Sequence, residues 1–315
     1  MGSDVALDGT AFERYRRSAS ERTTLPRLIA GLLVIVLAWM LATVAVIALG
    51  MLVHAWLGSE GADGGMAGFL STPVGVLTAL GSFSGIWIGA WIAMRFIHRE
   101  PLSALFGNSR RISRADFAKG FCAVALTSLF SEILLYALDP QVTRGSIGIV
   151  PWLLALVPVA LLALLQTSSE ELLFRGYLVR ALARRFSSPL VWAVLPVLVF
   201  AVLHWSPSAS PAMNVAGLIT IGVFAGLLVV LVYATGNIGA AMGAHLANNL
   251  FGFLLISHQQ AYNAFALFEA RPLEGGNWGG AEAFCIGAIG AVSTLLTALL
   301  LLHRRSPLRV CADAG

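Results

Sequence analysis

The sequence has little charge. Asp, Glu, Lys and Arg make up only 11% of its 315 residues, whereas a typical soluble domain carries roughly 25%. Hydrophobic residues reach 58%, and the mean hydropathy is +0.83. So few charged side chains cannot form the surface of an ordinary soluble fold, and the composition predicts an integral membrane protein.

Paired cysteines are also missing. Cys122, Cys285 and Cys311 have no paired spacing, which excludes a disulfide framework and a zinc knuckle. Cys311 stands fifth from the last residue, and a prenylation signal needs the cysteine fourth. The segment before residue 27 is polar and holds no apolar core, so we expect no cleavable signal peptide.

The net charge of +4 and the pI near 9.3 would suit a nucleic-acid-binding protein. The basic residues, however, are mostly arginines that flank apolar runs, which is the topology signal of a membrane protein. We therefore expect a lipid bilayer as the partner, and no nucleic acid.

Apolar runs of spanning length dominate the chain, since a membrane-spanning helix needs about 20 residues. They lie near 28–53, 74–97, 120–138, 149–172, 189–205, 213–234, 237–256 and 281–302. The predicted fold class is all-α, a bundle of about eight transmembrane helices. A transmembrane domain over 28–302 is flanked by an N-terminal segment, 1–27, and a tail, 303–315. No internal repeat is visible, which gives no support to an inverted-repeat transporter.

The basic residues also predict the orientation. If the N-terminus is cytoplasmic, all but Arg144 and Arg271 of the 20 basic residues fall on the inner side. Such an asymmetry predicts two cytoplasmic termini and an even number of spans. The protein is therefore expected to be a multi-pass protein of the cell membrane, and its arginine- and alanine-rich composition is compatible with a bacterial cytoplasmic membrane.

Ionisable side chains within spans are costly and usually functional. Glu171 and Arg175 are four residues apart on one helical face and are expected to form an ion pair. Glu170 points elsewhere and has Phe174 four residues further on, so no cation pairs with it there. An unpaired carboxylate in apolar surroundings suits a general base. Glu132 is interpreted as a helix-packing residue.

Spacing brings the candidates together. Glu170 lies 17 positions before Ser187, in the expected turn between two spans, and His204 lies 17 positions after it. In an antiparallel hairpin these two side chains reach the same height. His245 is about eight residues, or about 12 Å, from the turn that precedes its own span. A carboxylate and two imidazoles are thus expected to meet in a cavity in the cytoplasmic half of the bundle, as in a hydrolase.

Three short motifs follow in order on the fourth, fifth and seventh of the expected spans. They are EELLFR (Glu170, Glu171, Arg175), FAVLH (Phe200, His204) and HLANN (His245, Asn249). This pattern of EExxxR, FxxxH and HxxxN resembles the CAAX protease and bacteriocin-processing family of intramembrane proteases, also called the Abi family. The resemblance covers about residues 150–255, which would form the protease core.

The resemblance implies an eight-helix membrane endopeptidase. Glu170 would activate a water with the help of His204, and His245 and Asn249 would stabilise the oxyanion. The second glutamate and the arginine of the first motif would hold the first glutamate in place. The substrate would be a peptide or membrane-associated protein that reaches the cavity from the cytoplasm or the lipid.

Three alternatives stay open at this point. The family has been described as metal-dependent, and Glu170, His204 and His245 could ligate Zn²⁺ with one open position. No HExxH helix supports this, so the preferred mechanism needs no cofactor. The protein could also be a non-catalytic membrane scaffold or immunity protein, or a transporter in which the same residues relay protons.

Overall fold

The computed structural model describes residues 9–58, 65–275 and 278–315. Every predicted apolar segment is helical, which confirms the all-α fold class. In chain order the segments form α2 (Leu25–Trp56); α4 (Pro73–Ser82), α5 (Ser84–Ile92) and η2 (Ala93–His98); α6 (Arg114–Leu138); α7 (Ile149–Glu171), η4 (Leu172–Val179) and α8 (Arg180–Arg185); η5 (Leu190–Val194) and α9 (Leu195–Val202); α10 (Pro211–Thr235); α11 (Gly239–Leu250) and η6 (Phe251–Leu255); and α12 (Gly280–Leu302).

Among the described residues, six helical runs are long and apolar enough to cross a membrane. They are 25–56, 73–98, 114–138, 149–185, 211–235 and 280–302. The run Leu190–Val202 is apolar but shorter, and α11 with η6 is not among the six. The protein is therefore a multi-pass membrane protein, while eight crossings and cytoplasmic termini stay predictions.

The outer surface of the bundle is apolar. On α2, Leu33, Leu41 and Val44 are 64%, 63% and 70% exposed. Exposed leucines and valines recur along α6, α7, α9 and α12. A soluble protein would have to bury such an apolar surface away from water, whereas lipid tails solvate it without cost.

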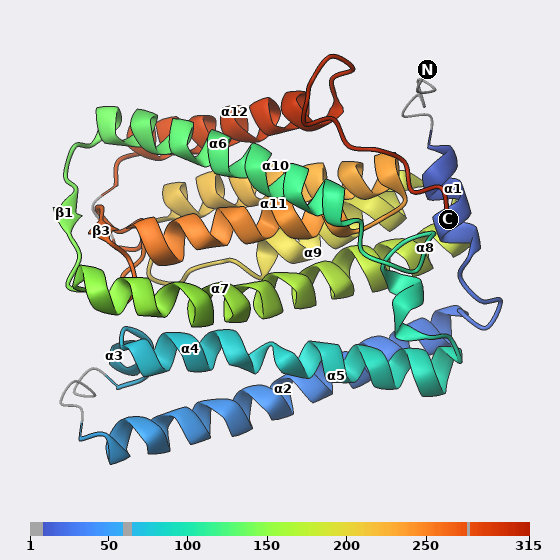
Figure 1. The fold of residues 1–315 in the computed structure, drawn as a ribbon, viewed down its shortest axis with the longest axis horizontal. Coiled ribbons are helices and arrows are strands. Elements are labelled where there is room, and N and C mark those ends of the chain that lie inside the picture. Colours follow the sequence, from blue (N-terminus) through green and yellow to red (C-terminus); the bar gives the residue numbers. More distant parts are fainter. Residues whose placement is uncertain (1–8, 59–64, 276–277) are drawn as a thin grey trace.

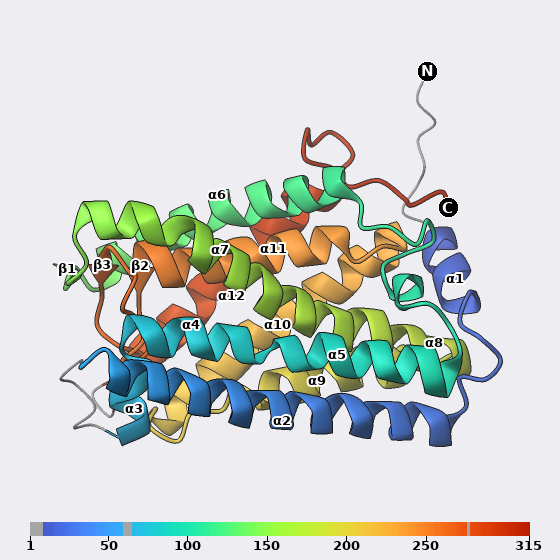
Figure 2. The ribbon, with the colours of Figure 1, turned by 60° about the horizontal axis from the view of Figure 1, so that its bottom comes forward.

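The helices pack in layers along one long axis (Figures 1 and 2). α2 lies against α4 and α5, and Gly85 and Gly89 allow this approach: a β-carbon on either would lie 2.6 Å from the backbone of α2. These two glycines thus allow close packing of the helices.

The short helix α11 lies at the centre, between α6, α7 and α10. Its residues from Gly239 to Ala247 are all buried. Small side chains make this possible, because a β-carbon on Gly243 would collide with the Phe117 carbonyl oxygen of α6, and one on Gly120 with that of Ala240. The HLANN motif is therefore held by backbone-to-backbone packing.

The two ends of the bundle differ, and we name them by what they carry. The terminal end holds both chain termini, the helix α1 (Thr10–Arg17), the 3-10 helix η3 (Leu102–Leu105) and residues 303–315. The sheet end holds α3 (Gly65–Leu70) and three two-residue strands in the order β1-β3-β2, namely β1 (Thr143–Arg144), β3 (Phe268–Glu269) and β2 (Ile256–Ser257).

Candidate active site

The first motif lies where α7 widens into a π-helical turn. α7 ends at Glu171 and η4 begins at Leu172; such turns are frequent at functional sites. Arg175 Nη1 lies 2.8 Å from Glu171 Oε1, and the two side chains are 1% and 0% exposed. The ion pair expected from the spacing is present, and Arg175 also donates to the Ala225 carbonyl oxygen of α10 at 3.2 Å.

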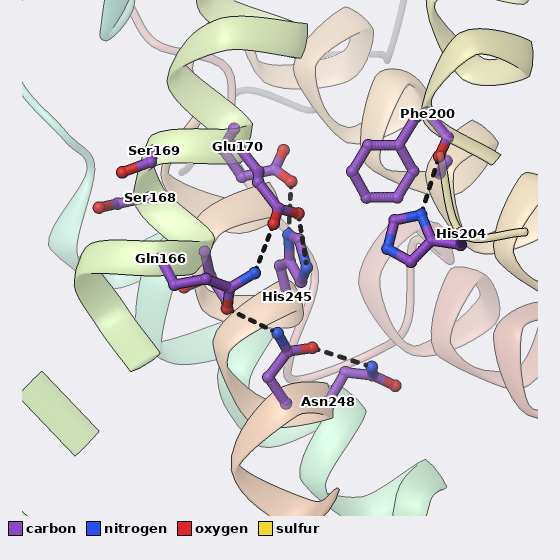
Figure 3. Close-up of polar contacts among 12 residues, drawn as sticks. Gln166, Ser168, Ser169, Glu170, Phe200, His204, His245 and Asn248 are labelled. Carbon is purple, nitrogen blue, oxygen red and sulfur yellow. Dashed lines mark hydrogen bonds and ion pairs between the residues drawn. The ribbon is translucent and has the colours of Figure 1, made fainter. Parts of the chain in front are cut away.

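His245 of α11 bridges the two glutamates. Its Nδ1 lies 2.8 Å from Glu171 Oε1, and its Nε2 lies 3.6 Å from Glu170 Oε2. The Glu171 carboxylate only accepts hydrogen bonds, so Nδ1 carries the proton of this contact. The ring is thereby fixed with Nε2 toward Glu170 (Figure 3).

Gln166 connects Glu170 with the third motif. Its amide Nε2 donates to Glu170 Oε1, and its Oε1 accepts from Asn249 Nδ2 at 2.8 Å. The expectation of an unpartnered Glu170 therefore needs correction. Glu170 has a partner four residues before it, on the same helical face, whereas the sequence interpretation looked for one only four residues after it. The i−4 spacing of Gln166 was the signal that could have found this residue.

One oxygen of Glu170 is left for chemistry. Within the described part of the chain, Glu170 Oε2 is buried without a hydrogen-bond partner. It lies beside His245 Nε2 at 3.6 Å, which is longer than a hydrogen bond. A buried acceptor without a partner is costly, and its retention in a native fold points to a catalytic or binding use.

His204 lies on the opposite side of the site (Figure 3). It follows the end of α9, is exposed, and its Nδ1 contacts the Phe200 carbonyl oxygen at 2.8 Å. The Phe200 ring separates His204 from the charged cluster. The centre of the Phe200 ring lies 4.8 Å from that of His204, 6.0 Å from that of His245 and 4.8 Å from the Arg175 guanidinium. The hairpin thus brings both motifs to one site, with Phe200 as the spacer.

A cavity of about 490 Å³ joins these residues. The site residues that line it are Gln166, Phe200, His204, His245, Asn248 and Asn249. The cavity continues between α6, α10 and α12 toward the sheet end, where Glu132, His258 and Gln259 line it. One continuous space therefore connects the motif residues with the sheet end of the bundle.

At the terminal end, hydrogen bonds hold the C-terminal tail. The Asp313 carboxylate accepts from the Ser109 backbone at 3.0 Å, the Ser109 hydroxyl at 2.9 Å and Asn237 Nδ2 at 2.8 Å. Its backbone donates to the Thr235 carbonyl oxygen at 2.7 Å. Partial burial disfavours the charged carboxylate, but these hydrogen bonds outweigh it and lower the pKa of Asp313. The C-terminal tail is thus fastened over the ends of α10 and α11.

The side chains do not gather as a zinc site would require. Among the described residues, no group of three or more His, Cys, Asp or Glu side chains is placed to hold a metal ion. The Nδ1 contacts of the two histidines, to Phe200 and Glu171, leave both Nε2 atoms open to a ligand, but His204 stands across the site from Glu170 and His245 (Figure 3). The set Glu170, His204 and His245 therefore does not fit zinc in this arrangement, and metal dependence stays a prediction.

Comparisons with known proteins agree with the motifs. Residues 150–251 match the family described as type II CAAX prenyl endopeptidase Rce1-like. The uncharacterized protein YyaK of Bacillus subtilis (strain 168) is 29% identical over 216 residues, which cover 65% of this chain and 68% of that protein. No solved structure matches. The resemblance drawn from the motifs is confirmed for residues 150–251, and the family implies protease activity in the membrane.

Proposed function

We propose that this protein is an intramembrane endopeptidase in which Glu170 activates a water to hydrolyse a peptide bond. The observation that carries the proposal is Glu170 Oε2, a buried carboxylate oxygen with no hydrogen-bond partner in the described structure. Glu171 Oε2 shares this feature, but the Glu171 carboxylate is held by Arg175 and His245 through its other oxygen. It belongs to the one glutamate of the motif that the buried arginine does not neutralise directly, because Arg175 pairs with Glu171.

The proposed reaction starts with a water held between Glu170 and His204. Glu170 Oε2 takes a proton from the water, and the water oxygen attacks the carbonyl carbon of the scissile bond. The tetrahedral intermediate then collapses: the C–N bond breaks, and the amine leaves with the proton that Glu170 carried. Products are a carboxylic acid and an amine, so atoms and charge balance without another reactant.

Two donors would stabilise the oxyanion. Asn249 Nδ2 has two hydrogens and gives only one of them to Gln166, at 2.8 Å. His245 is the second donor when both of its ring nitrogens carry a proton, because Nδ1–H is already directed at Glu171. Preorganised donors of this kind contribute roughly 10²–10³ in rate each, and Gln166 would keep the base and Asn249 in register because it bonds to both.

The substrate class follows from the site's surroundings and from the family. An extended peptide or a membrane-protein tail fits a mostly apolar cavity that carries several polar side chains within an apolar bundle. The family's name includes the CAAX prenyl endopeptidases, so a lipid-modified C-terminal tail is one class to test, next to unmodified membrane-protein segments. Zinc would enter this proposal only if the site rearranged to gather its donors.

The test uses the purified full-length protein in liposomes with a peptide library. Wild type should cleave at least one peptide, and Glu170→Gln should lower the rate by about 10²–10⁴, the usual worth of a general base. Glu13→Gln, on the solvent-facing side of α1, is the matched control and should cleave normally.

Three outcomes would count against the proposal in different ways. Cleavage that survives both Glu170→Gln and His204→Ala would remove these residues from the mechanism. Loss of activity with a chelator and recovery with Zn²⁺ would replace the glutamate mechanism by the metal-dependent one. If wild type cleaves no peptide, a scaffold or immunity role becomes the better explanation.

A further inference from the structure

A second polar pair lies in the same cavity, away from the motifs. Glu132 of α6 and His258, which follows β2, contact each other through Oε2 and Nε2 at 3.0 Å. Their side chains are 17% and 21% exposed, and both line the cavity that holds His245 and Asn249. Glu132 thus makes a packing hydrogen bond, as interpreted from the sequence, and in addition it lines the cavity.

The wall between this pair and the motif residues is polar. Thr127 of α6 and Thr297 of α12 share a hydrogen bond of 2.7 Å between their hydroxyls, and Ser293 donates to the Thr127 carbonyl oxygen at 3.0 Å. All three line the cavity. Hydroxyls along a wall suit a peptide backbone, with its donors and acceptors, better than a lipid tail.

The distance between the two places can be estimated along α6. Gly120 lies level with Ala244, since a β-carbon there would be 3.1 Å from the Ala244 backbone nitrogen. Glu132 is twelve residues further along the helix, or about 18 Å at 1.5 Å per residue. An extended peptide advances about 3.3 Å per residue, so Glu132 lies about five substrate residues from His245.

The Glu132 carboxylate has room for another donor. His258 occupies Oε2, and no donor to Oε1 is found in the part of the chain that the structure describes. The neighbouring carboxylates Asp139 and Glu282 are neutralised by Arg271, at 3.5 Å and 3.3 Å. Among the described residues that line the cavity, Glu132 is the one carboxylate, and its partner is the His258 imidazole.

We propose that Glu132 forms a subsite for a cationic side chain, Lys or Arg, about five residues from the scissile bond of the peptide. The subsite rests on the proposed endopeptidase function, and it assigns to the cavity a preference for basic peptides. A partly buried carboxylate binds a cation by a charge-assisted hydrogen bond, which is about twice as strong as a neutral one.

The test separates binding from cleavage. Full-length Glu170→Gln protein in nanodiscs is titrated with fluorescent peptides of one sequence. The peptides carry Arg, norleucine or Glu at the fifth residue on either side of the expected bond. The Arg peptide should bind about tenfold more tightly than the norleucine peptide, in line with one charge-assisted hydrogen bond. Adding Glu132→Gln should abolish this ratio, and Glu132→Lys should shift the preference to the Glu peptide.

His258→Ala keeps the test decisive if Glu132 variants fold poorly. Removal of the imidazole leaves the carboxylate to the substrate alone, so the preference for Arg should increase. Thr167→Val, whose hydroxyl bonds only within α7, is the control and should change nothing. Equal affinity for Arg and norleucine peptides in all these proteins would overturn the subsite. Discrimination without any cleavage by wild type would instead reject the endopeptidase function and keep the subsite.

Discussion

The two ends of this bundle use polar residues in opposite ways. At the terminal end, Asp313, Ser109 and Asn237 bond to one another and fasten the tail over α10 and α11. At the sheet end, Glu132 and His258 face a cavity that leads to the motif residues. The same kind of side chain fastens the tail at one end and lines a passage at the other.

This difference bears on how a substrate arrives. The sequence predicts an approach from the cytoplasm or the lipid, with both termini cytoplasmic. The cavity, however, extends toward the end away from the termini. If the arginine-rich terminal end is cytoplasmic, the sheet end faces the other side of the membrane. The orientation and the route both stay predictions, and the experiments below sharpen them.

The largest effect is expected midway between the two ends, at the buried pair. Arg175→Met leaves Glu171, at 0% exposure, without its cationic partner and with the His245 imidazole as the remaining contact, and breaking such a pair costs about 3–5 kcal/mol. SDS titration of the protein in detergent micelles measures the loss. The pair of Arg16 with Glu13 is partly exposed, so Arg16→Met should cost less than about 1 kcal/mol. Equal losses for the two variants would contradict the account.

The next effect concerns Gln166, which lines the cavity and contacts both Glu170 and Asn249. Gln166→Leu removes both the donor to Glu170 and the acceptor for Asn249, and kcat should fall by about 10²–10³ with little change in KM. A positioning role also predicts a changed pH profile of kcat, because the environment of the base changes. Thr167→Val is the neighbouring control. A rise in KM with unchanged kcat would show that Gln166 only contacts the substrate.

A smaller effect is expected where α6 and α11 touch. Gly243→Ala puts a methyl group against the Phe117 carbonyl oxygen, and overpacking of this kind costs about 1–3 kcal/mol. Gly226 of α10 has open space around it, so Gly226→Ala should be neutral or slightly stabilising. Unfolding titrations of both variants compare the two helices; a stable, active Gly243→Ala protein would show that the contact is looser than described.

The smallest effect belongs to the terminal end. Asp313→Asn weakens the fastening of the tail and should cost about 1 kcal/mol at neutral pH. The pKa of Asp313 is lower in the folded protein than in the unfolded chain. The stabilisation is therefore complete above about pH 4 and lost as the pH falls through the folded pKa. Unfolding of wild type and variant at several pH values should show a difference that shrinks only in acid; a difference that shrinks near pH 7 would implicate another group.

Much of this arrangement could be predicted from the sequence. Helical spans follow from long apolar runs, and the pairing of Glu171 with Arg175 follows from their spacing. Hairpin geometry predicts that His204 meets Glu170; it brings the two segments together, but the structure places the Phe200 ring between His204 and the charged cluster. The bond between Gln166 and Asn249 could not be predicted, since it joins α7 to α11 through side chains whose relative rotation depends on tertiary packing. The position of Glu132 also depends on tertiary structure, because a residue on α6 faces the cavity only once α10, α11 and α12 surround it.

The most direct test of the contrast between the ends is to modify a single cysteine at each end and to measure whether peptide cleavage is inhibited. In nanodiscs, where both ends are accessible, one protein carries Gln259→Cys as its sole cysteine and another keeps only Cys311, which is exposed at the terminal end. Each is treated with a charged methanethiosulfonate, and cleavage of a peptide substrate is measured. Modification at residue 259, which lines the cavity, should lower the rate about tenfold or more, whereas modification of Cys311 should leave it unchanged. Inhibition through Cys311, with residue 259 insensitive, would contradict it.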